Sequence, residues 1–409
     1  MERMGDFSWR PELYLLPVVP FRYGFRFLGQ RILLGDLDVH QGSALKRSDK
    51  IKEMLRRPRP REELTPDRFL SSGSTLLNLA CTGRPDGAFL KGHYYHFVGD
   101  SQSGKTFFTL SCLAEACRSP AFDEYRLIYD DTEGGALMDV ERFFGAKAAA
   151  RIEPPGWNAD GSPQYSRTVE EYYYHVDDAL KVGRPFVYVL DSQDGLTSKA
   201  ERDKFQKNKR AVRKEAPDAA GPTGSYGDGK AKAHSSDLRQ LIRPLQDTGS
   251  ILMIVNQTRD SFDLFEKSCY SGGRALLFYA TLQLWSRLDG AIVRTVAGKK
   301  RQVGNWCRVR VKKNRVLGQD RTVRVPILLS HGIDETGSLI EYLIDEGCWR
   351  EEAGVVTVTG LGPEFAMRRE ALAQKIEDGD LTDDVRELVV LKWSEVEAAC
   401  EVKRRARYE

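Results

Sequence analysis

Long apolar runs are missing from this chain of 409 residues. None approaches the roughly 18 residues that a membrane-spanning helix requires. The start, residues 1–20, also lacks the basic-then-apolar layout of a signal peptide. We therefore expect neither export nor a membrane partner.

Paired cysteines and clustered histidines are missing too. The seven cysteines are odd in number and include no C-x-x-C pair, which argues against a disulfide framework and a zinc site. We read this as a protein of a reducing cytoplasm. The histidines are dispersed without ligand spacing, and we predict that all are structural or at the surface: His40, His93, His96, His175, His234 and His331.

A large net charge is also absent, because 62 Lys and Arg stand against 59 Asp and Glu, a balance of +3. Overall charge therefore gives little attraction to nucleic acid or membrane. Locally the balance differs, and cations dominate residues 46–61, 199–214 and 294–315. One such run is typical of a solvated face, but three in one chain make that explanation weaker.

The composition, with 41% hydrophobic and 30% charged residues, is that of a folded protein long enough for two or three domains. We predict an N-terminal element and linker over 1–68, a core over 69–350 and a small helical region over 351–409. The Pro/Arg cluster at 56–61 breaks any helix before the core. Helices are predicted from Pro363 to Glu377 and from Thr382 to about Arg404.

Short apolar runs recur through the core and often end in polar residues, a pattern typical of buried parallel strands in an α/β sheet. The predicted strands are Tyr94–Val98, Arg126–Tyr129, Phe186–Leu190, Ile251–Val255, Thr281–Trp285, Cys307–Val311 and Val323–Leu329. Residues 198–234, first charged and then rich in Gly, Pro and Ala, are predicted to form a long functional loop.

The strongest motif fits G-x-x-x-x-G-K-[ST] between a predicted strand and a predicted helix. Its glycines let backbone N–H groups turn toward phosphate oxygens, its lysine reaches the terminal phosphates, and its hydroxyl faces Mg²⁺. The residues are Gly99, Asp100, Ser101, Gln102, Ser103, Gly104, Lys105 and Thr106. We expect ATP and Mg²⁺ as cofactors, with Thr106 on the metal.

Three further strand ends carry polar groups suited to the same chemistry. Asp191 follows an apolar run and is the expected second metal ligand. Glu133, after Asp130 and Asp131, is the candidate to activate a water, and Gln257 is the candidate phosphate sensor. In an open α/β sheet such strand ends meet in one site.

At this point the sequence resembles the RecA-type recombinases, over most of 69–349. Residues 72–80 are similar to the family's S-x-G-x-x-x-L-D-x-x-L lead-in, and Ser271–Ala280 to its T-G-G-N-A-L-x-F-Y-A stretch. Arg308–Arg315 resembles the family's R-V-K-V-x-K-N-K strand. The version here looks most like the bacteriophage-encoded members.

The resemblance implies a RecA-like P-loop ATPase core with a central, mostly parallel sheet, a small N-terminal polymerisation element and a small helical C-terminal region. It gives Glu133 the role of catalytic glutamate and Gln257 that of γ-phosphate sensor. Lys313 and Arg315 would reach across a subunit interface to a neighbour's nucleotide, and Asp139 would contact adenine. Phe278 would couple neighbouring nucleotides.

The resemblance also implies two DNA-binding loops, at about 196–234 and 258–273. It assigns DNA contacts to Lys230, Lys232, Arg239, Gly272, Gly273 and Arg274. Phe262, Leu264 and Phe265 are candidates to insert between bases, or are ordinary core residues. The first loop is longer and more basic than the family pattern, and Leu277 stands where a lysine is usual.

The implied function is ATP-dependent DNA strand exchange by a nucleoprotein filament on single-stranded DNA, with homologous duplex DNA as second substrate. It would serve homologous recombination, repair and recombination-dependent replication, in the cytoplasm of a bacterial or phage-infected cell. One alternative is a ring-forming helicase of the same fold, although about 70 residues before the core are few for a helicase N-terminal domain. The other is an ATP-switched recombination mediator, against which the intact Glu133 and Asp191 argue.

Overall fold

The computed structural model describes residues 64–213, 228–260 and 268–404. Residues 64–409 form one compact unit, and the predicted N-terminal element up to residue 63 lies outside the described residues. Outside them too are Phe262, Leu264 and Phe265 and the middle of the predicted first DNA loop. The predicted boundaries at 68 and 350 stay predictions.

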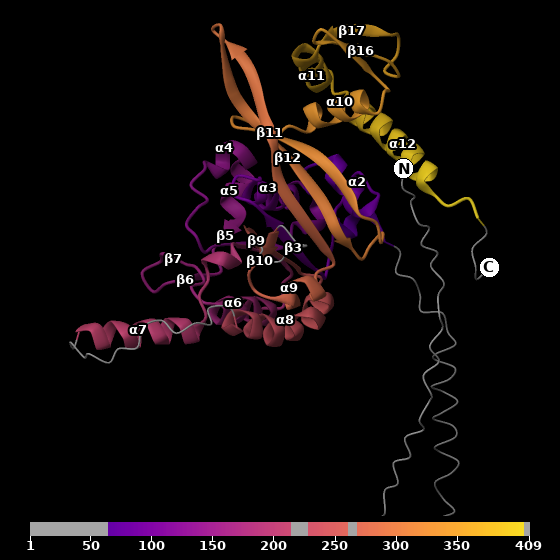
Figure 1. The fold of residues 1–409 in the computed structure, drawn as a ribbon. Coiled ribbons are helices and arrows are strands. Elements are labelled where there is room, and N and C mark those ends of the chain that lie inside the picture. Colours follow the sequence, from indigo (N-terminus) through magenta and orange to yellow (C-terminus); the bar gives the residue numbers. More distant parts are fainter. Residues whose placement is uncertain (1–63, 214–227, 261–267, 405–409) are drawn as a thin grey trace, which may run out of the picture. The chain divides into compact units, whose positions relative to one another are not determined.

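The main sheet has the strand order β14-β13-β12-β11-β3-β9-β8-β4-β5, with β10 paired to β9 (Figure 1). Neighbouring strands from β11 to β5 run parallel, as predicted for the core. Their bounds are β3 (Tyr94–Gly99), β4 (Arg126–Asp131), β5 (Ile152–Glu153), β8 (Phe186–Asp191), β9 (Ile251–Asp260), β10 (Ser268–Tyr270) and β11 (Leu282–Val296).

The sheet is mostly parallel, as predicted, but its other side corrects the interpretation of Cys307–Val311 and Val323–Leu329 as parallel strands. β12 (Lys299–Asn314), β13 (Arg321–Leu328) and β14 (Gly332–Ile333) are antiparallel to their neighbours. β11 and β12 form a long antiparallel hairpin joined by a tight turn. The hairpin projects beyond the sheet (Figure 1), because β11 pairs with β3 only over Leu282–Ser286. The cationic run 294–315 lies on this hairpin, and several of its arginines form ion pairs, including Arg308 with Asp289.

Alternating side chains of the central strands build two apolar layers. In β8, Val187 and Val189 join the layer on one face, whereas Phe186, Tyr188 and Leu190 join the other. The first layer is covered by α2 (Thr75–Thr82) and α3 (Lys105–Arg118), and the second by α6 (Val169–Lys181), α8 (Asp228–Thr248) and α9 (Arg274–Tyr279). This is the two-sided burial typical of α/β folds.

Short elements connect these layers. They are η1 (Pro66–Arg68), β1 (Phe69–Leu70), β2 (Phe89–Leu90), η2 (Pro120–Phe122), α4 (Val140–Phe144), α5 (Ala146–Arg151), β6 (Gly156–Trp157), β7 (Pro163–Gln164) and η3 (Gln193–Gly195). None of the helices in the described ranges has the length and apolar content that a membrane span needs.

The predicted long loop over 198–234 is largely helical in its described parts. α7 (Lys199–Arg213) occupies the charged half, and α8 begins at Asp228. The physical reason is composition, because Lys, Arg, Glu, Gln and Ala are good helix formers even without an apolar face to bury.

The C-terminal region is helical at its end but begins with a small sheet that the sequence analysis did not predict. β15 (Arg350–Glu352), β16 (Val355–Val358) and β17 (Phe365–Arg368) form an antiparallel sheet, followed by α11 (Arg369–Asp378) and α12 (Thr382–Cys400). α10 (Glu335–Asp345) precedes it. The β-branched run Val355–Val358 favours a strand, and β17 pairs with it. β17 occupies Phe365–Arg368, so the helix predicted from Pro363 begins at Arg369.

One buried carboxylate anchors the end of β4. Asp130 accepts hydrogen bonds from Ser166 N (2.9 Å), Ser166 Oγ (2.5 Å) and Tyr188 Oη (2.7 Å), and burial raises the pKa of its carboxyl group. The next residue, Asp131, is half-exposed and accepts from Gly135 N and Ala136 N.

We expect Asp130→Ala to lower the free energy of unfolding by about 3 kcal/mol, because it strands three donors in the interior. Asp131→Ala is the control and should cost about 1 kcal/mol, the value of a lost turn cap. Chemical denaturation of the two variants measures the difference. Equal losses would contradict the anchoring role.

Candidate functional site

Four parallel strands end at one edge of the sheet. In the register, Gly99 of β3 pairs with Gln257 of β9, and Asp131 of β4 pairs with Asp191 of β8. Every polar strand end that the sequence singled out therefore comes to the same edge, as expected for a ligand site in an open α/β sheet.

The loop between β3 and α3 is closely backed by neighbouring residues. A Cβ at Gly99 would lie 2.3 Å from the carbonyl oxygen of Ser286, and one at Gly104 would lie 2.6 Å from Ile327 Cδ1. Gly104 also has φ +85°, a conformation that side chains disfavour. Both glycines of the motif are thus required by space, and Gly104 by backbone geometry as well.

Lys105 is buried and folded onto its own loop. Its Nζ donates to the carbonyl oxygens of Gly99 (2.9 Å) and Asp100 (2.6 Å). Burial lowers the pKa of this amine, while the carboxylates of Asp191 and Asp100 oppose the shift. A cation held only by carbonyls in a site rimmed with acids is placed to exchange those bonds for an anionic oxygen.

Thr106 and Asp191 face each other, as predicted for a shared metal. Thr106 Oγ1 donates to Asp191 Oδ2 at 2.7 Å, and Tyr129 Oη donates to the same oxygen at 2.8 Å. Burial raises the pKa of the Asp191 carboxyl group. A divalent cation on this oxygen would favour the charged carboxylate that burial disfavours.

Glu133 and Gln257 are joined directly. Gln257 Nε2 donates to both carboxylate oxygens of Glu133, at 3.0 and 3.1 Å, and Ser192 Oγ donates to one of them. Asp130 is buried and Asp131 caps a turn, so among the three acids at and just after the end of β4 only Glu133 is exposed beside the site. This agrees with the choice of Glu133 from the sequence.

These residues fit a nucleoside triphosphate with a divalent metal. No side chain caps the N-terminus of α3, so its first N–H groups face the loop without a side-chain acceptor. Within the described ranges, no cluster of three or more His, Cys, Asp and Glu is arranged to hold a metal by itself. A metal here would therefore rely on Thr106, Asp191 and phosphate oxygens together, as in other P-loop sites.

Lys313, Arg315 and Asp139 do not join the strand-end cluster in this chain. Lys313 Nζ donates to the carbonyls of Leu277 and Phe278, and Arg315 donates to that of Phe278 at 2.6 Å. Asp139 caps α4 through Arg142 N at 3.0 Å.

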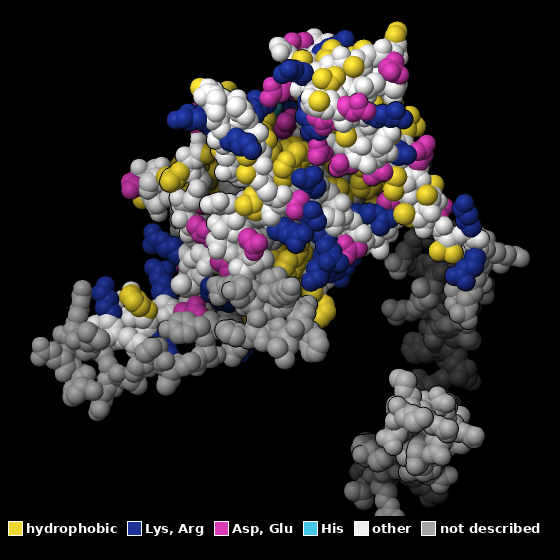
Figure 2. Space-filling view, turned by 45° about the horizontal axis from the view of Figure 1, so that its top comes forward, with side chains coloured by type: hydrophobic (Ala, Val, Ile, Leu, Met, Phe, Trp, Pro, Cys, Tyr) yellow, Lys and Arg dark blue, Asp and Glu magenta, His cyan; other side chains and the backbone are white. Residues whose placement is uncertain are grey.

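The candidate DNA-contacting residues lie on two elements. Lys232 and Arg239 are exposed on one face of α8, whereas Lys230 is half-buried on the opposite face, given 100° per residue. Gly272 (φ +93°) and Gly273 (φ +80°) end the second loop, and Arg274 is exposed at the start of α9. Figure 2 shows Lys and Arg mixed with Asp and Glu over the face it presents, consistent with a nearly neutral chain.

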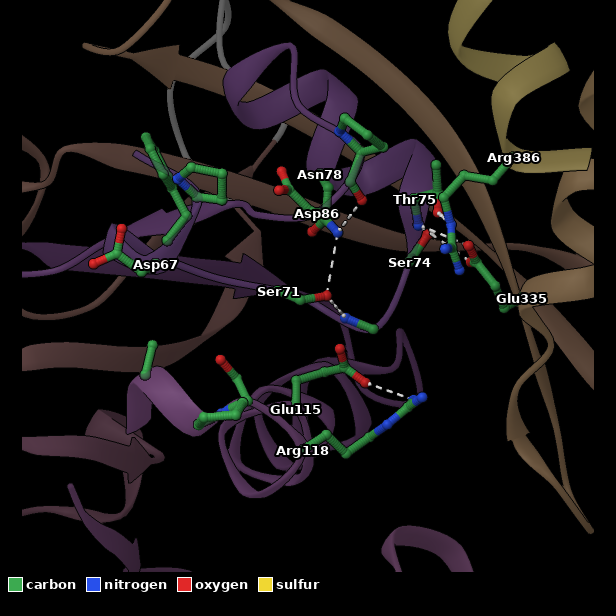
Figure 3. A pocket seen from close by; sticks show the side chains of 17 residues that line it. Asp67, Ser71, Ser74, Thr75, Asn78, Asp86, Glu115, Arg118, Glu335 and Arg386 are labelled. Carbon is green, nitrogen blue, oxygen red and sulfur yellow. Dashed lines mark hydrogen bonds and ion pairs between the residues drawn. The ribbon is translucent and has the colours of Figure 1, made fainter. Parts of the chain in front are cut away.

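A separate cavity of about 670 Å³ lies beside the lead-in to α2 (Figure 3). Its polar groups are already paired: Glu335 accepts from Thr75 N at 3.1 Å, and Arg386 Nε donates to Thr75 Oγ1 at 3.1 Å. Asn78 accepts from Ser72 N at 2.9 Å. The residues of the predicted lead-in motif thus fix α2 and tie it to α12, and they take no part in the strand-end cluster.

Several residues of the site escaped the sequence analysis. Tyr129, Ser192 and Asp194 contact Asp191, Glu133 and Gln257 respectively. Thr258 Oγ1 donates to Asp100 Oδ1 and so connects β9 to the phosphate loop. Their position at the same strand ends was the available signal, but single Tyr, Ser and Thr residues do not form a motif.

Comparison with known proteins gives consistent matches. A family model for the RecA N-terminal domain matches residues 221–334. The protein RecA of Corynebacterium efficiens is 25% identical over 337 residues, covering 81% of this chain and 76% of that relative. The protein RecA of Acidothermus cellulolyticus is 26% identical over 337 residues, covering 80% of this chain and 85% of its own.

A solved structure of the RadB recombinase aligns at 17% identity with a TM-score of 0.42, over 65% of this chain and 98% of that chain. At this score the alignment adds nothing to the argument. The ordered motifs, the matching family model and the long matches to RecA proteins agree with one another and with the strand-end site. The chain is thus similar to the RecA-type recombinases over about 80% of its length.

Proposed function

We propose that the protein is an ATP-dependent DNA strand-exchange recombinase that acts as a filament on single-stranded DNA. One observation carries this proposal: a chain of the RecA type brings the phosphate loop, Asp191, Glu133 and Gln257 to one edge of its sheet.

The nucleotide part of the proposal assigns each residue one task. Lys105 and the N–H groups of the loop bind phosphate oxygens, and Thr106 with Asp191 holds Mg²⁺, which neutralises phosphate charge when bound. Glu133 orients and deprotonates the attacking water, while Gln257 senses the terminal phosphate and transmits its presence to the second loop. Asp139 is proposed to contact the base.

The DNA part of the proposal rests on position and charge. Lys232, Arg239 and Arg274 are exposed cations on the two elements that follow the site, and glycine backbone lets N–H groups approach phosphates. Lys230, Gly272 and Gly273 complete the proposed contact set. Homologous duplex DNA is the second substrate, and we place this activity in the cytoplasm of a bacterial cell. Origin from a bacteriophage stays a prediction.

ATP hydrolysis with and without single-stranded DNA, measured across protein concentrations, tests the function. We expect strong stimulation by DNA that rises cooperatively, together with large assemblies in sedimentation of the same samples. Turnover that ignores DNA in small particles would contradict the recombinase. Turnover near zero with saturating DNA would point to the mediator alternative.

Glu133→Gln should separate nucleotide binding from hydrolysis. The amide keeps an acceptor for Gln257 but cannot take a proton, so we expect turnover to fall about 100-fold or more while ATP binding persists. Lys105→Ala is the contrasting variant and should abolish binding itself. Equilibrium binding of a fluorescent ATP analogue beside steady-state turnover distinguishes the two, and unchanged hydrolysis by Glu133→Gln would remove it from the catalytic role.

Lys313 should confer a pH dependence. Burial, with some contribution from Arg315, lowers the pKa of its amine to about 8. The amine is charged below that pKa, so a role as cation on a neighbour's phosphate should weaken as pH rises from about 7 to about 9. We expect DNA-stimulated turnover of the parent to decline over this range.

Lys313→Arg should remove the decline, because arginine stays charged, whereas Lys313→Ala should keep nucleotide binding and lose DNA stimulation. Lys312→Arg is the matched control and should leave the decline in place. The same decline in Lys313→Arg as in the parent would show that another group titrates.

A further inference from the structure

A buried series of hydrogen-bonded polar side chains adjoins the candidate site. It starts at Gln283 of β11, passes through His96 of β3 and Asn256 of β9, and ends at Gln193 of η3 and Ser271. The first four side chains are at most 2% exposed. The sequence analysis had assigned His96 no role beyond the structural one.

Each hydrogen bond in this chain fixes the direction of the next. Gln283 Nε2 donates to His96 Nδ1 at 3.1 Å, so the proton of the neutral ring is on Nε2. His96 Nε2 donates that proton to Asn256 Oδ1 at 2.7 Å. The amide of Asn256 therefore points its Nδ2 away from His96, and its orientation is determined by the histidine.

The amide nitrogen of Asn256 faces oxygen atoms only. Nδ2 donates to Gln193 Oε1 at 2.7 Å, to Asp194 Oδ2 at 3.2 Å and to the carbonyl of Ser271 at 3.3 Å. With the amide reversed, its oxygen would face these three acceptors and repel them. His96 thus excludes the reversed amide although it contacts none of the three.

The Asn256 end of this hydrogen-bonded series adjoins both the proposed sensor Gln257 and the end of the second loop. Gln257 follows Asn256 directly, and its N–H donates to Asp194 Oδ2 at 2.7 Å. Ser271 Oγ lies 2.6 Å from Asp194 Oδ1 and 2.7 Å from Gln193 Oε1, and its single proton is shared between these two acceptors. One set of acceptors therefore holds Gln257 and the C-terminal end of the loop.

The hydrogen bonds of this series of side chains are less complete at Gln193, beside the loop, than at His96 in the core. Gln193 Nε2 has no hydrogen-bond partner among the described residues, and a Cβ on Gly272 would lie 3.2 Å from it. Both ring nitrogens of His96, in contrast, are bonded. A change in position of Ser271 or Gly272 is therefore expected to alter the bonds at Gln193 before those at His96.

The opposite end adjoins the proposed subunit interface. Gln283 pairs with His96 in the parallel register and with Lys313 in the antiparallel one, so it lies between them. Its neighbour Lys313 is the cation proposed to reach another subunit's nucleotide. The series of hydrogen bonds thus runs from Gln283, beside Lys313, to Asn256, beside Gln257.

We propose that His96 is a positioning residue that couples the nucleotide sensor Gln257 to the second DNA loop, through Asn256, Gln193 and Ser271. This proposal rests on the proposed function, since it concerns DNA-stimulated ATP turnover. It adds a residue that acts through its neighbours and touches neither nucleotide nor DNA.

The test compares His96→Leu with His96→Gln and with a matched control, His93→Leu. His93 precedes the same strand and bonds Thr281 Oγ1 at 3.1 Å, but it has no bond to Asn256. Glutamine offers one donor and one acceptor, so it is able to replace both bonds of the imidazole. The readouts are thermal unfolding, binding of a fluorescent ATP analogue, and turnover against single-stranded DNA concentration.

We expect His96→Leu to bind nucleotide within about twofold of the parent and to lose DNA-stimulated kcat by about tenfold or more. His96→Gln should recover kcat to within about threefold, and His93→Leu should match the parent. Equal DNA stimulation in His96→Leu and the parent would overturn the proposal. So would an equal loss in His93→Leu, or a folded His96→Gln that is as impaired as the leucine variant.

A second variant keeps the test decisive if His96→Leu does not fold. Gln283→Met is close in shape and removes only the donor to His96 Nδ1, so it should lower DNA-stimulated kcat with unchanged nucleotide affinity. Full stimulation in a folded Gln283→Met would overturn the proposal. A parent that DNA does not stimulate would refute the proposed function, whereas a stimulated parent with equally stimulated variants would refute the role of His96 alone.

Discussion

The parallel hydrogen-bond register of β3, β4, β8 and β9 is the constraint on which the site depends. It brings Gly99 beside Gln257 and Asp131 beside Asp191, although these residues are far apart in the sequence. A shift of one residue in any of these strands would also exchange the two buried faces, and both faces are filled by apolar side chains. Core packing therefore fixes the register, and the register places the site.

The electrostatics of the strand ends explain why a triphosphate would have to enter with a metal. Lys105 is surrounded by the carboxylates of Asp191, Asp100, Glu133 and Asp194, the acids that act on its pKa. One buried amine does not balance these acids against an incoming anion. A divalent cation at Thr106 and Asp191 would supply the missing charge, and phosphate oxygens would replace the carbonyls that now accept from Lys105.

The sequence was informative where local pattern and tertiary structure agree. The apolar runs ending at Val98, Tyr129, Leu190 and Val255 became the four central strands, and the phosphate-loop motif has the strand and helix that its chemistry requires. Long-range pairing was out of reach, because alternation does not reveal that β11 and β12 form an antiparallel hairpin. Helix α7 was missed because its charged sequence has no apolar face.

The supporting residues of the site were the hardest to predict. Tyr129 and Asn256 are ordinary strand residues in the sequence, and their roles depend on the strand that lies beside them. His96 was grouped with the other histidines as structural or at the surface, and its bonds to β9 and β11 depend on sheet order. Sheet order is a property of the whole chain, so no window of sequence contains it.

The most direct test of the account is electron microscopy of the protein with single-stranded DNA and a non-hydrolysable ATP analogue. The account predicts helical filaments in which Lys313 and Arg315 of one protomer lie at the nucleotide that its neighbour holds with Lys105 and Thr106. Closed rings on DNA would favour the helicase alternative. A nucleotide site completed within one chain, with Lys313 still on the carbonyls of α9, would contradict the central claim that neighbouring protomers complete the site.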